Sequence, residues 1–363
     1  MHCRSISSMF DQREGVHENA PDIRDQDTKV YLIAPAEAQP MSLSNISTDD
    51  GTFYSSSTSD SLVVREFHDA LMRNHDMAVA VSAIKALTSV MRKSTATTMM
   101  GLEKELREAA NSLERCNPTA ISLQAGCELF LRFVTRTAAT YAENEDFNVC
   151  KAMLIQRGTR FTETSVRARQ TIAEIGATFV RNGMVVLTHG NSRVVFTLLQ
   201  RAASKGVRFR VIVTEGRPDS TGVSMARDIE KLGIPVTMVL DSGVAYAMER
   251  VSMVLVGAEG VVESGGIINK LGTYQISLCA KALNVPVYVA AESYKFARIY
   301  PLGQHDFLSD RKHVDFGPLL PRDVAVDNPS ADYTPPSCIK LLLTDLGVLT
   351  PAAVSDELIQ LYL

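Results

Sequence analysis

Five short polar segments of the sequence carry residue types that could bind a negatively charged ligand. Each follows a short apolar run: THGNSR follows residues 184–187, TEGRPDSTG follows 209–213, DSG follows 236–240, GAEGVVESGGIINKLGT follows 253–256, and AESYKF follows 287–290. Their glycines let backbone N–H groups approach a ligand closely, and their arginines and lysines supply positive charge. The residues that we expect to bind a phosphate or sugar phosphate are His189, Asn191, Ser192, Arg193, Arg217, Glu259, Asn269 and Lys270. The plainer alternative for each segment is an ordinary turn or helix cap.

The same segments offer few groups for catalysis. His189 could act as a general base because histidine titrates near neutral pH, or it could donate a structural hydrogen bond to a neighbouring strand end. Asp241 and Glu259 could be catalytic carboxylates, or they could cap helices and anchor loops. No G-x-G-x-x-G follows the first apolar run, and G-x-x-x-x-G-K-[ST] is absent, so neither a dinucleotide site nor a P-loop is predicted. Histidines and carboxylates lack metal-ligand spacing, so we expect no metal site and no cofactor.

Parallel strands joined by helices would bring the polar segments together. The apolar runs alternate with amphipathic segments such as VVFTLLQRAASKG and SMARDIEKLG, which predicts β-strand–helix–β-strand units. Ligands of such sheets bind at the carboxyl ends of the strands, where all five segments lie. CIKLLLTDLG predicts one more strand, and Thr350 and Pro351 predict the start of a closing helix. The predicted fold class is α/β, with a Rossmann-like, mostly parallel sheet over residues 182–363 and helices on both faces.

The residues before the sheet have a different pattern. Residues 61–181 show apolar stripes at helical spacing, such as Val63, Phe67 and Leu71, and predict a helical N-terminal domain whose last long helix covers 147–181. Residues 1–60 are rich in Ser, Thr and Asp and predict a disordered tail, with a phosphorylatable regulatory tail as the alternative.

Composition limits the classes of partner. The net charge of −4 gives no reason to expect a nucleic-acid or membrane partner. The six cysteines form no C-x-x-C, which is typical of reduced thiols in the cytosol. The first residues lack the apolar core of a secretory signal, and no apolar run approaches the roughly 18 residues of a membrane span.

Several longer strings resemble the alpha subunits of eukaryotic translation initiation factor 2B. These strings are VLTHGNSRVV, VGAEGVVESGGIINKLGTYQ, AESYKFARIYPL, LLLTDLGVLTPAAVSDELIQLYL and, in the helical part, DMAVAVSAIKAL and AGCELFLRF. The resemblance covers residues 62 to 363. It implies a regulatory, non-catalytic subunit of the complex that exchanges GDP for GTP on initiation factor 2. The implied partners are a second copy in a homodimer, the beta and delta subunits, and initiation factor 2, especially its phosphorylated alpha subunit, with cytosolic localisation.

The same fold family includes the ribose-1,5-bisphosphate and methylthioribose-1-phosphate isomerases, which resemble this sequence in part. They carry a cysteine in LTHC and an aspartate in GAD, whereas this sequence has Gly190 in LTHG and Glu259 in GAE. The isomerases also have an arginine before Pro-Thr-Ala, where this sequence has Asn117. Because glycine offers no acid or base, the resemblance implies a pocket that binds a sugar phosphate or nucleoside monophosphate without catalysis. A sugar-phosphate isomerase remains the alternative, and a free-standing metabolite sensor is a third.

The closing segment VLTPAAVSDELIQLYL has two interpretations. Its apolar residues Leu358, Ile359 and Leu361 could pack on the sheet of the same chain. They could also lie at a subunit interface, as the resemblance implies, in which case truncation after Gly347 should yield monomers.

Overall fold

The computed structural model describes residues 61–74, 77–141, 146–314, 316–317, 320–321 and 323–362. These residues fall within one compact unit, Asn45–Leu363. The predicted tail, residues 1–60, lies outside the described residues. None of the described helices is long and apolar enough to cross a membrane.

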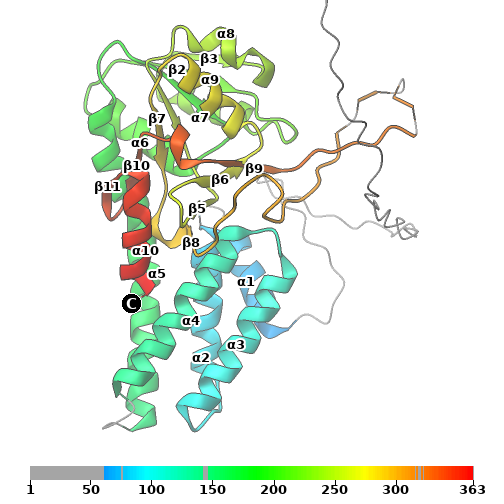
Figure 1. Cartoon of the computed structure of the whole chain (residues 1–363). Helices are drawn as coiled ribbons and strands as arrows, with labels where there is room; N and C mark the ends of the chain where they lie inside the picture. The colour runs from blue at the N-terminus through cyan, green and yellow to red at the C-terminus, as the bar shows by residue number, and fades with distance from the viewer. Residues whose placement is uncertain are drawn as a thin grey trace, which may run out of the picture. The chain divides into compact units, whose positions relative to one another are not determined.

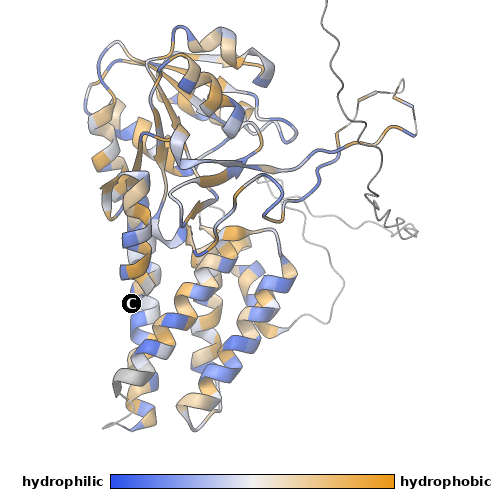
Figure 2. Ribbon diagram, viewed as in Figure 1, coloured by the Kyte–Doolittle hydropathy of each residue, from blue (hydrophilic) through white to orange (hydrophobic). Residues whose placement is uncertain are grey.

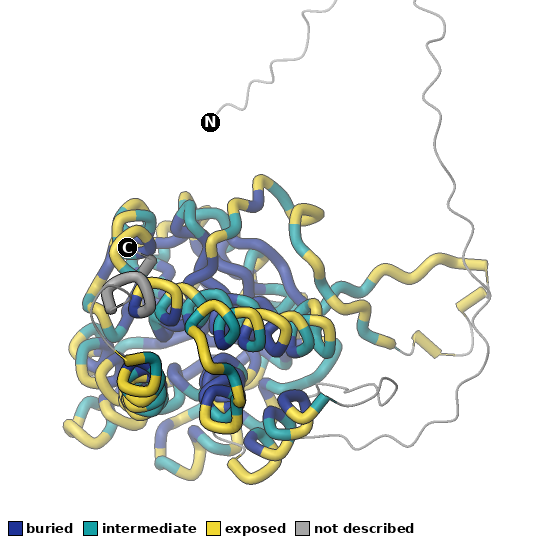
Figure 3. Tube along the Cα trace, turned by 90° about the horizontal axis from the view of Figure 1, so that it is seen from below, coloured by how far each residue is buried: buried dark blue, intermediate teal, exposed yellow. Residues whose placement is uncertain are grey.

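Five helices form the first part of the fold, which we call the helical part. They are α1 (Leu62–Arg73), α2 (Val79–Lys93), α3 (Met99–Cys116), α4 (Ile121–Tyr141) and α5 (Phe147–Gly176). The helices carry both hydrophobic and hydrophilic residues along their length (Figure 2). Their apolar residues meet in one core that includes the fully buried Phe67, Ile84 and Leu102. Figure 3 shows that the helices bury one side and expose the other, as amphipathic helices do. The predicted long helix ends at Gly176 and continues as a 3-10 turn, η1 (Ala177–Phe179).

A seven-stranded sheet forms the centre of the second part, which we call the sheet part (Figure 1). Its strands are β1 (Val185–His189), β2 (Arg210–Thr214), β3 (Val236–Val239), β4 (Met253–Val256), β7 (Val287–Ala290), β10 (Leu341–Thr344) and β11 (Gly347–Leu349). The order is β11-β10-β7-β4-β1-β2-β3, and only β11 is antiparallel to its neighbour. The six predicted strands are therefore confirmed. The strand order reverses between β1 and β4, which is where ligands bind in open α/β sheets.

Helices cover both faces of this sheet, as predicted. The helices are α6 (Arg193–Ser204), α7 (Gly222–Lys231), α8 (Val244–Met248), α9 (Thr273–Ala282) and α10 (Val354–Tyr362). Along β1, Val186 packs with α6 and α7, whereas Val185 and Leu187 pack with α8, α9 and α10. Successive side chains of β1 therefore point to opposite faces of the sheet and enter two different hydrophobic cores. Thr350 makes no side-chain cap, and the 3-10 turn η5 (Pro351–Ala353) precedes the regular helix α10.

A second, four-stranded sheet was not predicted. It has the order β8-β5-β6-β9 and consists of β5 (Gly260–Val262), β6 (Ile267–Lys270), β8 (Phe296–Ala297) and β9 (Ala331–Thr334). The glycine-rich segment after β4 was interpreted as a single polar corner, yet it contains the β5–β6 hairpin. The pairs Val261–Val262 and Ile267–Ile268 are fully buried, so these short apolar runs are sheet residues.

Candidate functional site

A cavity of about 250 Å³ lies where the helical part meets the carboxyl ends of β1 and β4. We call it the polar cavity. Seven of the eight predicted site residues line it: His189, Asn191, Ser192, Arg193, Glu259, Asn269 and Lys270. The helical part contributes Ala78, Val79 and residues 117 and 119–122, and the segment 308–310 forms a further wall. Four of the five polar segments therefore converge at the reversal of strand order, whereas the DSG segment after β3 contributes no lining residue.

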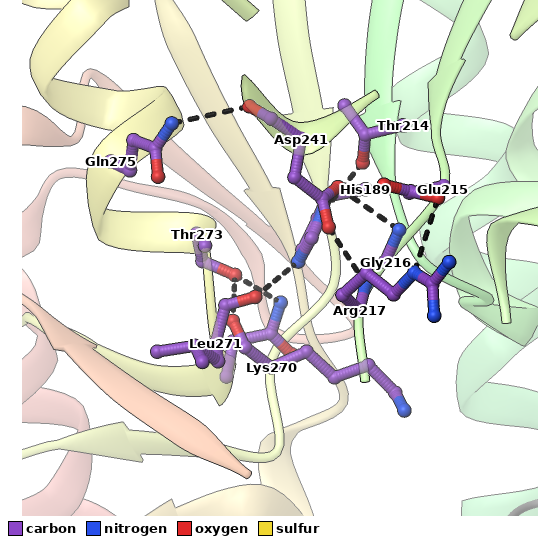
Figure 4. A network of polar contacts seen from close by, with 12 residues as sticks. His189, Thr214, Glu215, Gly216, Arg217, Asp241, Lys270, Leu271, Thr273 and Gln275 are labelled. Carbon is purple, nitrogen blue, oxygen red and sulfur yellow. Dashed lines mark hydrogen bonds and ion pairs between the residues drawn. The ribbon is translucent and has the colours of Figure 1, made fainter. Parts of the chain in front are cut away.

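Arg217 does not line the polar cavity. Its side chain is 63% exposed, and Nε lies 3.3 Å from Glu215 Oε2. The backbone N–H groups of Gly216 and Arg217 donate to the two oxygens of Asp241 (Figure 4). Asp241 therefore anchors the turn after β2, one of the two roles left open for it, while the guanidinium of Arg217 points away from the cavity.

The hydrogen bonds of His189 define its role. Nε2 lies 2.8 Å from the carbonyl oxygen of Leu271, which can only accept, so Nε2 carries the proton (Figure 4). Nδ1 then accepts from the Thr214 hydroxyl at 2.6 Å. Burial lowers the pKa of His189, although Asp241 partly opposes this. His189 is therefore a neutral structural donor, and neither ring nitrogen is left to act as a general base.

The three residues after Gly190 all make hydrogen bonds within the protein. Ser192 Oγ accepts from Val195 N at 3.5 Å and caps α6. Asn191 Nδ2 donates to Ser224 Oγ at 3.2 Å. Arg193 Nη1 donates to the carbonyl oxygen of Met77 at 3.2 Å, and so joins the sheet part to the helical part beside the cavity that Arg193 lines.

Gly190 itself has a backbone that favours glycine. Its φ is +59°, in the left-handed region where a side chain is strained. A Cβ there would lie 3.2 Å from both Lys270 Cδ and Thr221 Oγ1. No cysteine is among the described residues that line the polar cavity.

The charges that line the polar cavity are balanced. Lys270 Nζ lies 2.8 Å from Asp219 Oδ2, and Asn269 Nδ2 donates to Thr273 Oγ1 at 3.0 Å. Glu259 is reached by solvent at the cavity, yet protein surrounds it closely. Burial therefore raises its pKa against the opposing charges of Lys270, Lys295 and Lys312. An anion that binds here would have to compete with Asp219 for Lys270.

A buried ion cluster on one side of the cavity was missed by sequence reasoning. Glu292 is 2% exposed, and its carboxylate lies 2.9 Å from Lys295 Nζ and 3.5 Å from Arg169 Nε. Burial acts to raise the pKa of Glu292, but Lys295 and Arg169 outweigh it and hold the pKa at about 2. Lys295 Nζ also donates to the carbonyl oxygen of Ala258. The sequence marked AESYKF as a polar segment after a strand. Its residue pattern did not show which of its side chains face the cavity.

The N-terminus of α9 is capped by a side chain of β9. Asp332 Oδ2 accepts from the N–H groups of Gly272 (2.7 Å) and Tyr274 (3.1 Å). Burial raises the pKa of Asp332 to about 7, although both N–H groups lower it. A side chain of β9 thus occupies this helix end. Among the described residues, no cluster of three or more His, Cys, Asp or Glu side chains could hold a metal ion.

Fold and site together define an α/β protein with a small polar cavity between a helical bundle and the carboxyl ends of a parallel sheet. Residues 73–351 match the model of the Initiation factor 2 subunit family, and the chain belongs to this family.

Three proteins align with most of this chain. It is 45% identical over 311 residues to translation initiation factor eIF2B subunit alpha of Dictyostelium discoideum, covering 83% of this chain and 96% of that one. Identity to the protein of the same name from Caenorhabditis elegans is 35% over 301 residues, covering 83% and 98%. Identity to ribose 1,5-bisphosphate isomerase of Pyrococcus furiosus is 33% over 309 residues, covering 82% and 94%.

Solved structures share the fold. The Pyrococcus horikoshii OT3 translation initiation factor eIF-2B superposes with a TM-score of 0.63 at 26% identity, covering 80% of this chain and 97% of that one. A chain of the tetrameric eIF2B-beta2-delta2 complex from C. thermophilum superposes with a TM-score of 0.67 at 19% identity, covering 83% and 96%. The predicted fold class, a helical part followed by a mostly parallel sheet, is therefore confirmed.

Proposed function

We propose that the chain is a regulatory, non-catalytic subunit, of the alpha type, in the guanine nucleotide exchange factor for translation initiation factor 2. The observation that carries this proposal is the 45% identity to an eIF2B alpha subunit over 96% of that subunit's length. Similarity over a full subunit, rather than over one motif, supports the same place in the same assembly.

The partners follow from this proposal. They are a second copy of the chain in a homodimer, the beta and delta subunits, and initiation factor 2, especially its phosphorylated alpha subunit. The helical part would sense that phosphorylated subunit, and the complex would act in the cytosol.

A sugar-phosphate isomerase is the second candidate, because the Pyrococcus furiosus isomerase is 33% identical. Two features of the site favour the regulatory proposal. Gly190 supplies no thiol and has a positive φ, and both nitrogens of His189 are used in structural hydrogen bonds. Moving a proton between adjacent sugar carbons needs a positioned acid or base, and neither residue provides one.

We further propose that the polar cavity binds a sugar phosphate or a nucleoside monophosphate as a structural or regulatory ligand. Lys270, Lys295 and Lys312 face it, and residues of both parts of the fold line it. A ligand held there would contact the helical part and the sheet part at once.

Affinity purification of the tagged chain from cells tests the assembly proposal. We expect the beta and delta subunits to copurify, and reconstitution with these two subunits to give a larger particle by sedimentation. A chain that stays alone in both experiments would be a free-standing metabolite sensor instead. Turnover of ribose 1,5-bisphosphate by the pure chain would favour the isomerase.

A further inference from the structure

The sequence contains a single Asn-Gly pair, Asn182 and Gly183, and both residues are exposed. They form the turn that leads into β1, in which the Met184 N–H donates to the carbonyl oxygen of Arg181 at 3.2 Å. The φ of Gly183 is +82°, and glycine is favoured at the third position of a turn for this reason. Neither residue of the pair lines the polar cavity, so the turn lies outside the ligand site.

An Asn-Gly pair can react without an enzyme. The glycine nitrogen loses its proton and attacks Cγ of the asparagine side chain, which closes a succinimide ring and releases the side-chain nitrogen as ammonia. Water then adds to one of the two ring carbonyl carbons and breaks the bond from that carbon to the glycine nitrogen. Opening at one carbon gives aspartate, and opening at the other gives isoaspartate, whose main chain runs through the former side chain. Glycine favours ring closure because it has no side chain to hinder the attack.

In the folded chain both reacting groups are hydrogen-bonded to Arg208. The Gly183 N–H donates to the carbonyl oxygen of Arg208 at 2.8 Å, and Asn182 Oδ1 accepts from the Arg208 N–H at 2.7 Å. An amide hydrogen held in a hydrogen bond is removed by base mainly after that bond opens, as in hydrogen exchange. The contacts with Arg208 therefore oppose the first step of the reaction.

These contacts lie at one end of the β1–β2 pair. β2 begins at Arg210, whose N–H donates to the carbonyl oxygen of Met184 at 2.9 Å, and Arg208 itself is exposed. Hydrogen bonds at the end of a sheet open more readily than those at its centre. We propose that Asn182 is a modification site: the contacts with Arg208 suppress succinimide formation in the folded chain, and opening of this end of the sheet releases conversion to isoaspartate.

The two products differ in how they fit the turn. Isoaspartate adds one methylene to the main chain before Gly183, so Gly183 cannot keep its bond to Arg208 without a shift of the turn. Aspartate leaves the main chain unchanged and keeps a side-chain oxygen that accepts from the Arg208 N–H. The folded chain that carries isoaspartate should therefore have a lower Tm than Asn182→Asp.

The test compares the folded chain with the chain unfolded in guanidinium chloride, in the same mildly alkaline buffer. Protein L-isoaspartate methyltransferase with labelled S-adenosylmethionine counts isoaspartate. Fragmentation of the tryptic peptide 182–193 locates it, because that peptide also contains Asn191. We expect the unfolded chain to gain isoaspartate at Asn182 at least ten times faster than the folded chain. Asn111 and Asn284, exposed residues that precede serine and valine, should react more slowly than Asn182 in the unfolded chain.

Two substitutions of Arg208 isolate the contact with Asn182. Arg208→Pro removes the N–H that donates to Asn182 Oδ1, whereas Arg208→Ala keeps this N–H and removes the same side chain. In the folded state Arg208→Pro should react at Asn182 at least five times faster than Arg208→Ala, and the two should match when unfolded. Circular dichroism checks that both variants fold. If Arg208→Pro does not fold, the comparison of the folded and unfolded wild-type chain decides.

Several outcomes would overturn the proposal. They are equal rates in the folded and unfolded chain, and equal rates in folded Arg208→Pro and folded Arg208→Ala. Isoaspartate that appears first at Asn191 or Asn284 in the folded chain would place the modification elsewhere. Equal Tm values for the isoaspartate product and Asn182→Asp would show that the longer main chain fits the native turn.

Discussion

Glu292 is an ionised carboxylate in the protein interior, and Lys295 and Arg169 neutralise it. Glu292→Gln leaves these two cations without their partner, so we expect a loss of about 3 kcal/mol in the free energy of unfolding at pH 7. The pKa of Glu292 is depressed from 4.5 to about 2, so its contribution is complete above pH 4.5 and is lost as the pH falls towards 2. Urea denaturation at several pH values should show the difference from wild type shrinking over that range.

Glu174→Gln is the matched control, since Glu174 is a surface carboxylate that pairs with Arg201 and Lys205. Solvent screens this pair, so its removal should change stability little at any pH. A Glu292→Gln difference that stays constant from pH 7 to pH 2.5 would show that the buried ion pairs do not stabilise the fold.

Single residues also show where sequence reasoning stops. The sequence placed His189 at the end of a strand but left its role open between base and structural donor. The answer depends on the carbonyl oxygen of Leu271, 82 residues further along the chain. Arg217 follows a strand that ends near the cavity, but its guanidinium turns to Glu215. Strand order can predict which segments meet, whereas side-chain direction depends on contacts that have no local pattern.

The helix α10 has one buried and one exposed apolar residue, so it could both pack on its own sheet and contact another subunit. Leu358 is 3% exposed and packs in the core of the sheet part, whereas Ile359 is 53% exposed. Truncation after Gly347 would remove Leu349, Val354 and Leu358 from that core as well as any interface. A monomer produced by the truncation would therefore not identify an interface.

Point substitutions in α10 separate the two roles. Leu358→Ala should lower the free energy of unfolding by about 2–5 kcal/mol, because it leaves a cavity in the core. Ile359→Ala should change that free energy by less than about 0.5 kcal/mol. If α10 also lies at a subunit interface, Ile359→Ala should weaken self-association in sedimentation velocity. An unchanged dimer would leave α10 with its packing role alone.

Helices and strands could be predicted from the sequence where the residues of the element itself carry a hydrophobic pattern. Six of the seven strands of the large sheet are apolar runs of four or five residues, and the sequence predicted each of these six. The seventh, β11, has three residues, begins with a glycine and was not predicted. The second sheet was missed because its strands have two to four residues and pair across long loops, as Asn269 pairs with Asp332. Such pairing depends on tertiary contacts, which no local pattern shows. The glycines between these runs also make the segment look like a loop rather than a pair of strands.

Across the whole molecule, the polar cavity is where the helical part and the sheet part meet. Arg193, which lines it, donates to the carbonyl oxygen of Met77, and Lys295 joins the segments that follow β4 and β7. The division into a helical domain, 61–181, and a sheet domain, 182–363, stays a prediction. What the structure adds is that residues from both ranges line one cavity, so a ligand there would stabilise their contact.

That ligand can be sought by thermal unfolding with ribose 5-phosphate, AMP or inorganic phosphate at millimolar concentration. A ligand that binds only the folded chain should raise Tm by about 1–4 °C. Lys270→Gln should abolish most of this rise, because Lys270 faces the cavity. Asp219→Asn should increase the rise, because Asp219 pairs with Lys270 at 2.8 Å and competes with the anion. Arg217→Gln, outside the cavity, should leave it unchanged, and an equal loss in Arg217→Gln and Lys270→Gln would place the ligand elsewhere.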